Sequence, residues 1–137
     1  MNKKTILALI FIFALSQQEA IASNHKPLFV TITSDCCYTC KKLAPVLEEL
    51  QAEYDGQVEF ITLNISSRDQ IEEANQIASE YGIDEFFNKN KSSIPKVGIF
   101  CPGGTKVKKE FLAETRKEAY ENELNKLLAD TYSVCSL

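Results

Sequence analysis

The sequence predicts an α/β fold, a mixed four-stranded sheet with helices on both faces, in the order β-α-β-α-β-β-α. Three observations support this prediction. A strand–helix–strand pattern in the first half requires a parallel pair of strands joined by a right-handed crossover. A hairpin signal in the second half adds antiparallel strands. No repeat, low-complexity tract or linker divides the chain, so we expect one domain.

The strand–helix–strand pattern comes first. Leu28 to Thr33 and Val58 to Ile65 are rich in β-branched and apolar residues, which is typical of central strands covered on both faces. Between them, apolar residues recur at helical spacing from Leu43 to Tyr54. Pro45 falls inside this helix, and we expect a kink there because proline removes a backbone donor.

A second helix follows, with apolar residues at helical spacing from Ile71 to Tyr81. Ser66 or Ser67 is the expected N-cap, and Gly82 the expected end. The next residues, Asp84 to Ser93, are mostly polar and indicate a loop.

The last three elements are a hairpin and a helix. Val97 to Phe100 and Val107 to Phe111 read as short strands on either side of Pro102-Gly103-Gly104. Thr115 to Glu118 fits a capping box, and apolar residues from Tyr120 to Leu128 line one face of the final helix.

Residues 1–22 read as a signal peptide, and residues 23–137 as the domain. Lys3 and Lys4 form a basic start, and Thr5 to Leu15 an apolar stretch that is short for a bilayer span. Ala20-Ile21-Ala22 is a small-x-small cleavage site. We therefore expect an exported, periplasmic or otherwise extracytoplasmic protein without stable membrane insertion after cleavage. An uncleaved anchor is the alternative.

Composition narrows the partners. The formal net charge of −4 gives no electrostatic basis for binding nucleic acid. Separately, we expect the protein to be a monomer. Outside the cytosol thiols tend to pair, so the five cysteines allow at most two internal disulfides and leave one over.

Cys37-Tyr38-Thr39-Cys40 lies where the first strand gives way to the first helix. Two thiols at this spacing can close a small disulfide ring on the first helical turn. Unpaired backbone amides and the helix macrodipole favour an anionic first sulfur there. Cys37 is therefore the expected nucleophile.

The stretch from Cys37 to Pro45 resembles the active-site helix of the thioredoxin family. Val58 to Ile65 resembles its central strand, and Ile94-Pro95 before the hairpin resembles its cis-proline loop. The resemblance runs from about Leu28 to Ala129. It implies a thioredoxin-like fold and thiol-disulfide oxidoreductase activity on protein thiols or disulfides, without a cofactor.

In this interpretation Cys37 attacks a substrate disulfide and Cys40 resolves the mixed disulfide. The resemblance further implies that Pro95 is cis and that Ile94 and Pro95 bind the substrate backbone as an added strand. A purely structural Cys37–Cys40 disulfide and an ordinary trans Pro95 at the start of an edge strand are the alternatives.

Several residues depart from the family pattern. Tyr38-Thr39 is neither the Gly-Pro of thioredoxins nor the His-containing pair of strong oxidases. Thr31 and Thr62 stand where thioredoxins have a buried acid and its lysine partner. The expected proton-transfer aid is therefore missing, and the direction of electron flow and the redox partner stay undetermined. The first strand and helix of thioredoxin are not expected, because the domain starts shortly before Leu28.

Cys36 replaces the family's tryptophan. It has three interpretations: a vicinal disulfide with Cys37, exchange with the active pair, or a small buried apolar residue. Its neighbour Asp35 is expected to be a solvated charge. Phe86 and Phe87 are either core anchors or an apolar patch that binds clients.

Topology places Cys101 and Cys135 together. The strand after Pro95 runs away from the active site, and so does the last helix, which predicts a structural Cys101–Cys135 disulfide at the far end. Two free thiols, or a Cys135 linked to a partner protein, are the alternatives.

Two other functions compete. In one alternative, Cys36, Cys37 and Cys40 bind a soft ion such as Cu(I), although no zinc site is predicted because no second Cys-x-x-Cys or His pair occurs. A non-catalytic binding module, with the segment through Phe86 as its contact surface, is the other alternative.

Overall fold

The computed structural model describes residues 25–136, and the predicted signal peptide, residues 1–22, lies outside this range. Within the described residues, no helix has both the length and the apolar character needed to cross a bilayer.

Four strands form one mixed sheet in the order β2-β1-β3-β4. The strands are β1 (Leu28–Thr33), β2 (Glu59–Asn64), β3 (Lys96–Phe100) and β4 (Val107–Leu112). β1 pairs with β2 in parallel, whereas the β1–β3 and β3–β4 pairs are antiparallel. The predicted mixed four-stranded sheet is confirmed.

The prediction that the second strand is central is wrong, because β2 lies at one edge of the described sheet. Its burial differs from that of β1: five of the six β1 residues are buried, but only Ile61 and Leu63 in β2. Apolar content alone did not distinguish the two positions, since Phe60 is apolar and yet only half-buried at the edge.

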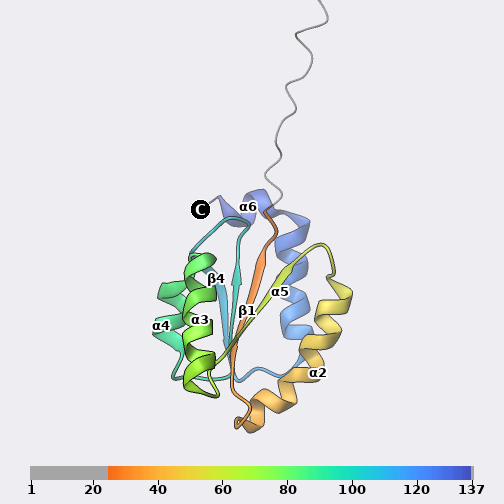
Figure 1. Ribbon diagram of the computed structural model, residues 1–137. Coiled ribbons are helices and arrows are strands. Elements are labelled where there is room, and N and C mark those ends of the chain that lie inside the picture. Colours follow the sequence, from red (N-terminus) through yellow and green to blue (C-terminus); the bar gives the residue numbers. More distant parts are fainter. Residues whose placement is uncertain (1–24, 137) are drawn as a thin grey trace, which may run out of the picture.

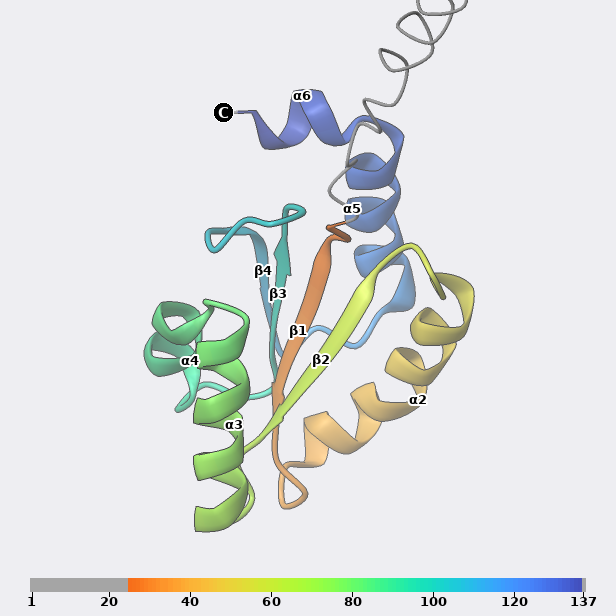
Figure 2. The ribbon, with the colours of Figure 1, turned by 45° about the horizontal axis from the view of Figure 1, so that its top comes forward.

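Helices cover both faces of the sheet, as predicted (Figures 1 and 2). α2 (Tyr38–Glu53) and α5 (Lys117–Ala129) lie on one face, and α3 (Arg68–Glu80) and α4 (Asp84–Asn90) on the other. A short helix, α6 (Thr131–Cys135), follows α5 and was not predicted. α2 continues as one helix through Pro45.

The alternating side chains of β1 divide the core in two. Phe29 packs with residues of α2 and α5, including the fully buried Tyr120. Val30 and Ile32 point to the other face and pack with residues of α3 and α4. A strand with apolar side chains on both faces needs cover on both, which explains the three-layer arrangement.

The loop predicted from Asp84 to Ser93 is wrong for most of its length, because α4 occupies Asp84–Asn90. Phe86 and Phe87 are buried against the sheet, with Phe86 edge-on to Phe100 at 5.3 Å between ring centroids. Most polar residues of this segment are exposed on a single short helix, whereas Asn90 is buried and its side-chain amide donates to the Phe86 carbonyl at 2.9 Å. Tertiary burial of two adjacent aromatics overrides the loop-like composition.

The expected caps have mixed outcomes. Ser67 is the N-cap of α3 and accepts a hydrogen bond from the Gln70 amide, and Gly82 follows this helix at φ +67°. The predicted capping box of α5 is wrong: Arg116 is the N-cap, without a side-chain cap. The Glu114 carboxylate instead accepts from the amides of Thr115 and Arg116.

Candidate active site

Strand register brings the predicted site residues together at one end of the strands. Thr33 at the end of β1 pairs with Asn64 at the end of β2. Ile32 pairs with Lys96, the first residue of β3, so the residues after β1 lie beside those before β3. The segment that contains Cys37 and the one that contains Pro95 are thus neighbours, although they are far apart in sequence.

Cys37 and Cys40 form a disulfide across the first turn of α2, with 5.1 Å between their Cα atoms. Cys37 is the N-cap residue, and its sulfur accepts a hydrogen bond from the Cys40 amide at 3.1 Å. Cys37 is half-buried, whereas Cys40 is only 5% exposed. The outer sulfur is therefore the one that an incoming molecule can reach.

The loop before Cys37 is tied to the turn after β2. The Asp35 amide donates to the Ser66 hydroxyl at 2.7 Å, and Asn64 Nδ2 donates to the Asp35 carboxylate at 3.2 Å. The Cys37 amide donates to the Ser34 carbonyl at 3.2 Å. Asp35 is exposed, as expected.

Sequence reasoning missed the positioning role of Ser34, Asn64 and Ser66. The available signal was that Asn64 ends one parallel strand and Ser34 and Ser66 lie just after the ends of the two, where the C-terminal ends of parallel strands come together.

The Ile94–Pro95 peptide bond is cis. Pro95 is buried and Ile94 half-buried. The Pro95 carbonyl accepts a hydrogen bond from the Ala113 amide at 2.9 Å. Ala113 has a φ of +53°. The bond joins the residue before β3 to the residue after β4 and fixes the proline loop to the sheet.

Cys36 is the free cysteine of the described chain, and it is exposed. The interpretation of Cys36 as a small buried residue is therefore wrong, and Cys37 pairs with Cys40 rather than with Cys36. The Cys36 amide donates to the Ser34 hydroxyl at 3.4 Å.

A hollow of about 370 Å³ lies beside Cys40. Thr31 and Thr62 pair directly across β1 and β2, and Thr31 is buried while Thr62 lines the hollow. Neither threonine can ionise near pH 7, so the Cys40 thiol has no acid or base at these two positions. The carboxylates that line this hollow with Cys40 are those of Asp35 and Glu48.

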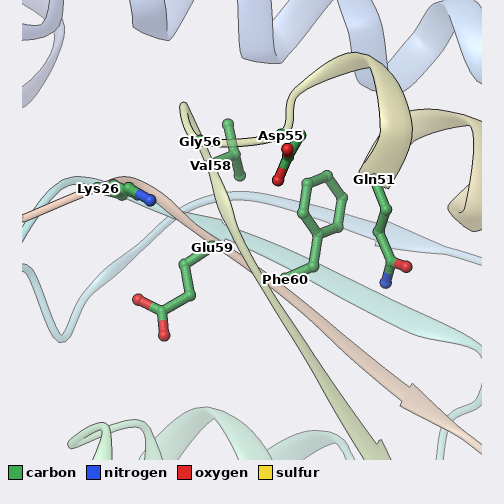
Figure 3. A pocket seen from close by; sticks show the side chains of 7 residues that line it. All are labelled: Lys26, Gln51, Asp55, Gly56, Val58, Glu59 and Phe60. Atoms are coloured by element: carbon green, nitrogen blue, oxygen red, sulfur yellow. The ribbon is translucent and has the colours of Figure 1, made fainter.

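A larger hollow, about 620 Å³, lies near the start of β2 (Figure 3). Its lining residues come from the end of α2, the turn that follows, the start of β2 and the segment before β1, and they are Lys26, Gln51, Asp55, Gly56, Val58, Glu59 and Phe60. It contains no cysteine and lies toward the opposite end of the strands from the disulfide.

The structure joins Cys101 and Cys135 in a second disulfide, with 5.8 Å between their Cα atoms. Cys101 follows β3 and Cys135 ends α6. α6 lies at the end of the molecule opposite the start of α2 (Figure 1). Phe86 and Phe87, in contrast, do not form a client-binding patch, because both are buried.

Within residues 25–136, no group of three or more His, Cys, Asp and Glu side chains is arranged to hold a metal ion.

Comparison with known proteins decides the family. The thioredoxin family model matches residues 12–126. This chain belongs to the thioredoxin family. Its Cys37-x-x-Cys40 pair and its relatives support thiol-disulfide oxidoreductase activity.

Bacterial thioredoxins are among the proteins similar to this chain. Thioredoxin 1 of Nostoc sp. is 33% identical over 90 residues, which cover 66% of this chain and 70% of that protein. Thioredoxin of Synechocystis sp. is 32% identical over 92 residues, covering 67% and 72%. Thioredoxin of Rickettsia felis is 30% identical over 91 residues, covering 66% and 73%.

Proposed function

We propose that this thioredoxin-family protein is exported and exchanges disulfides with protein clients through Cys37 and Cys40. The observation that supports this most is the difference in exposure between the two sulfurs of one disulfide. Cys37 is accessible at a helix start, while Cys40 is buried directly behind it. That order suits a nucleophile and a resolving thiol.

The exchange begins with the reduced pair. The Cys37 thiolate attacks one sulfur of a client disulfide, and the other client sulfur leaves as a thiolate that takes a proton from water. A mixed disulfide now joins Cys37 to the client. Cys40 loses its proton to water and attacks the Cys37 sulfur, which releases the client as a dithiol and leaves the Cys37–Cys40 disulfide. A redox partner that carries a dithiol then reduces the pair again.

The cis-proline segment supplies the client contact. Ile94 lies half-buried before Pro95, next to the edge where the disulfide lies. A client segment in extended conformation can pair with the backbone of Ile94 and present its sulfur to Cys37. Pro95 itself has no backbone N–H to donate.

The exported location rests on residues 1–22, whose basic, apolar and small-residue regions follow the order of a signal peptide. The second disulfide, Cys101–Cys135, is consistent with an oxidising compartment, because such bonds rarely persist in the cytosol. Fractionation of cells that produce the full chain, followed by N-terminal sequencing, tests both points. Recovery of uncleaved protein from the cytosol would refute export.

A trapping experiment tests the exchange. The Cys40→Ser variant cannot resolve the mixed disulfide, so it should accumulate client proteins on Cys37 that dithiothreitol releases. The Cys37→Ser variant, which lacks the nucleophile, is the matched control and should trap none. Equal trapping by both variants, or none by either, would argue against catalysis.

The reduction potential of the Cys37–Cys40 couple gives the direction. A value near −270 mV, as in thioredoxin, indicates a reductant, and one near −120 mV an oxidant.

A further inference from the structure

Two exposed apolar side chains lie at the end of the sheet where the disulfide lies. Tyr38, between the two cysteines, is 72% exposed, and Leu112, at the end of β4, is 58% exposed. Leu112 directly precedes Ala113, whose amide donates to the Pro95 carbonyl. Tyr38 and Leu112 thus belong to the same end of the molecule as Cys37, where a client must dock.

Positive charge accompanies Tyr38. The Lys42 ammonium lies over the Tyr38 ring, 4.7 Å from its centroid, and Lys41 and Lys42 are both exposed. Neither forms an ion pair with another residue of the described chain. The chain as a whole has a formal net charge of −4, so this cationic site contrasts with the rest of the protein.

These lysines do not serve helix stability. They lie close to the start of α2, whose first turn contains no acidic residue, and cations near a helix N-terminus oppose the macrodipole. The arrangement therefore disfavours the helix locally, by the small amount typical of exposed charges. A residue that breaks a local rule at an active site is a candidate for a functional role.

Acidic side chains on the neighbouring segments only partly offset this charge. Glu114 is paired with Arg116, and Glu110 with Lys96. Asp35 is exposed in the loop before Cys37 and accepts a hydrogen bond from Asn64. Glu48 is exposed farther along α2 and lines the hollow beside Cys40 together with Lys41. Lys42 is the cation that stays with the aromatic ring.

We propose that Tyr38 and Lys42, assisted by Lys41, form a docking site for client segments that carry carboxylates close to the reacting cysteine. This inference rests on the proposed exchange reaction and names its substrate class. The Tyr38 ring contacts apolar parts of the client, while the ammonium groups attract its carboxylates. The site selects among clients before the Cys37 sulfur attacks.

Two synthetic peptide disulfides test the proposal. They have the same length and sequence, except that Asp and Glu flank the cysteines in one and Asn and Gln in the other. With an excess of the reduced protein at low salt, we expect the second-order rate constant for peptide reduction to be about fivefold higher for the acidic peptide, the combined effect of two exposed charge contacts. Salt at about 0.5 M should remove most of the difference, because it screens exposed charges.

Variants assign the effect to the lysines. The double variant Lys41→Gln, Lys42→Gln should lose the preference for the acidic peptide and keep its rate with the neutral one. Lys108→Gln, at an exposed position on β4, is the matched control and should keep the preference. Tyr38→Ala should slow both peptides, because it removes the apolar contact.

The outcomes separate the two proposals. Equal rates for the two peptides would overturn the docking site and leave the exchange reaction intact. A double variant that slows both peptides equally would also overturn it, because the lysines would then act on the thiol instead of the client. Failure to exchange with either peptide in both directions, as disulfide with the reduced protein and as dithiol with the oxidised protein, would overturn the exchange reaction and the docking site with it.

Discussion

The backbone amide of Cys40 donates a hydrogen bond to the sulfur of Cys37 at 3.1 Å. Cys37 is the N-cap of α2, and its sulfur accepts from the third residue of the helix as the oxygen of a Ser or Asp N-cap normally does. A sulfur that accepts from the helix start is best stabilised when it is anionic. The same geometry leaves Cys40 buried beneath it.

The reduced protein should therefore be alkylated selectively at Cys37. At pH 6–7, iodoacetamide should label Cys37 at least about tenfold faster than Cys40, because the Cys37 sulfur is accessible and accepts from the helix start, whereas Cys40 is buried. Peptide mass mapping over time measures both rates, with Cys36→Ser as the background to remove the third thiol of the motif. Equal labelling of the two cysteines would contradict the assignment of the nucleophile.

The oxidised protein should present one reactive thiol. All five cysteines lie in the described range, two disulfides use four of them, and Cys36 is exposed. Ellman's reagent should titrate one thiol per native chain, and none in Cys36→Ser. A silent wild-type protein would mean that Cys36 is bonded or covered in solution.

Removal of the second disulfide should reduce stability and leave exchange intact. The bond links residues 34 apart in sequence, and the chain-entropy model gives about 4 kcal/mol for a loop of this size. In a urea titration, the free energy of unfolding of the double variant Cys101→Ser, Cys135→Ser should be lower by about 4 kcal/mol. Its peptide-reduction rate should match the wild type, because the bond lies away from Cys37; a lost rate in folded protein would contradict this.

Gly98 on β3 is required by its neighbour on α4. A Cβ added at Gly98 would lie 2.7 Å from Cζ of Phe86, which is buried and packs edge-on against Phe100. Gly98→Ala should destabilise the fold by about 1–3 kcal/mol through overpacking. Combining it with Phe86→Leu should recover part of the loss in a urea titration, and simple additivity of the two changes would argue against the contact.

Glu114 should contribute stability that depends on pH. The Arg116 side chain and amide lower the pKa of this carboxyl from 4.5 to about 2. Because the folded-state value is depressed, the contribution is present above about pH 4.5 and disappears as the pH falls toward 2. The Tm difference between wild type and Glu114→Gln should be largest near pH 6 and shrink toward pH 2. Glu73→Gln, an exposed residue on α3, is the control and should show a small difference at every pH.

Local sequence patterns determined most of the secondary structure. β1 is found at the predicted residues, because a continuous apolar, β-branched run favours a buried strand regardless of its neighbours. Ser67 and Gly82 bound α3 as expected, since capping depends on backbone groups within one turn. The Cys-x-x-Cys motif was likewise predicted from local sequence to lie at a helix start, where Cys37 is the N-cap of α2.

Tertiary structure decided what depends on residues distant in sequence. The polar segment from Asp84 became a helix because the sheet buries Phe86 and Phe87, and β2 became an edge strand because of the strand order. The folded chain alone shows that Asn64 and Ser66 support the active-site loop and that Lys42 lies over the Tyr38 ring. Propensity and periodicity act over a few residues, whereas burial, strand order and charge pairing are set by contacts that form only when the whole sheet is assembled.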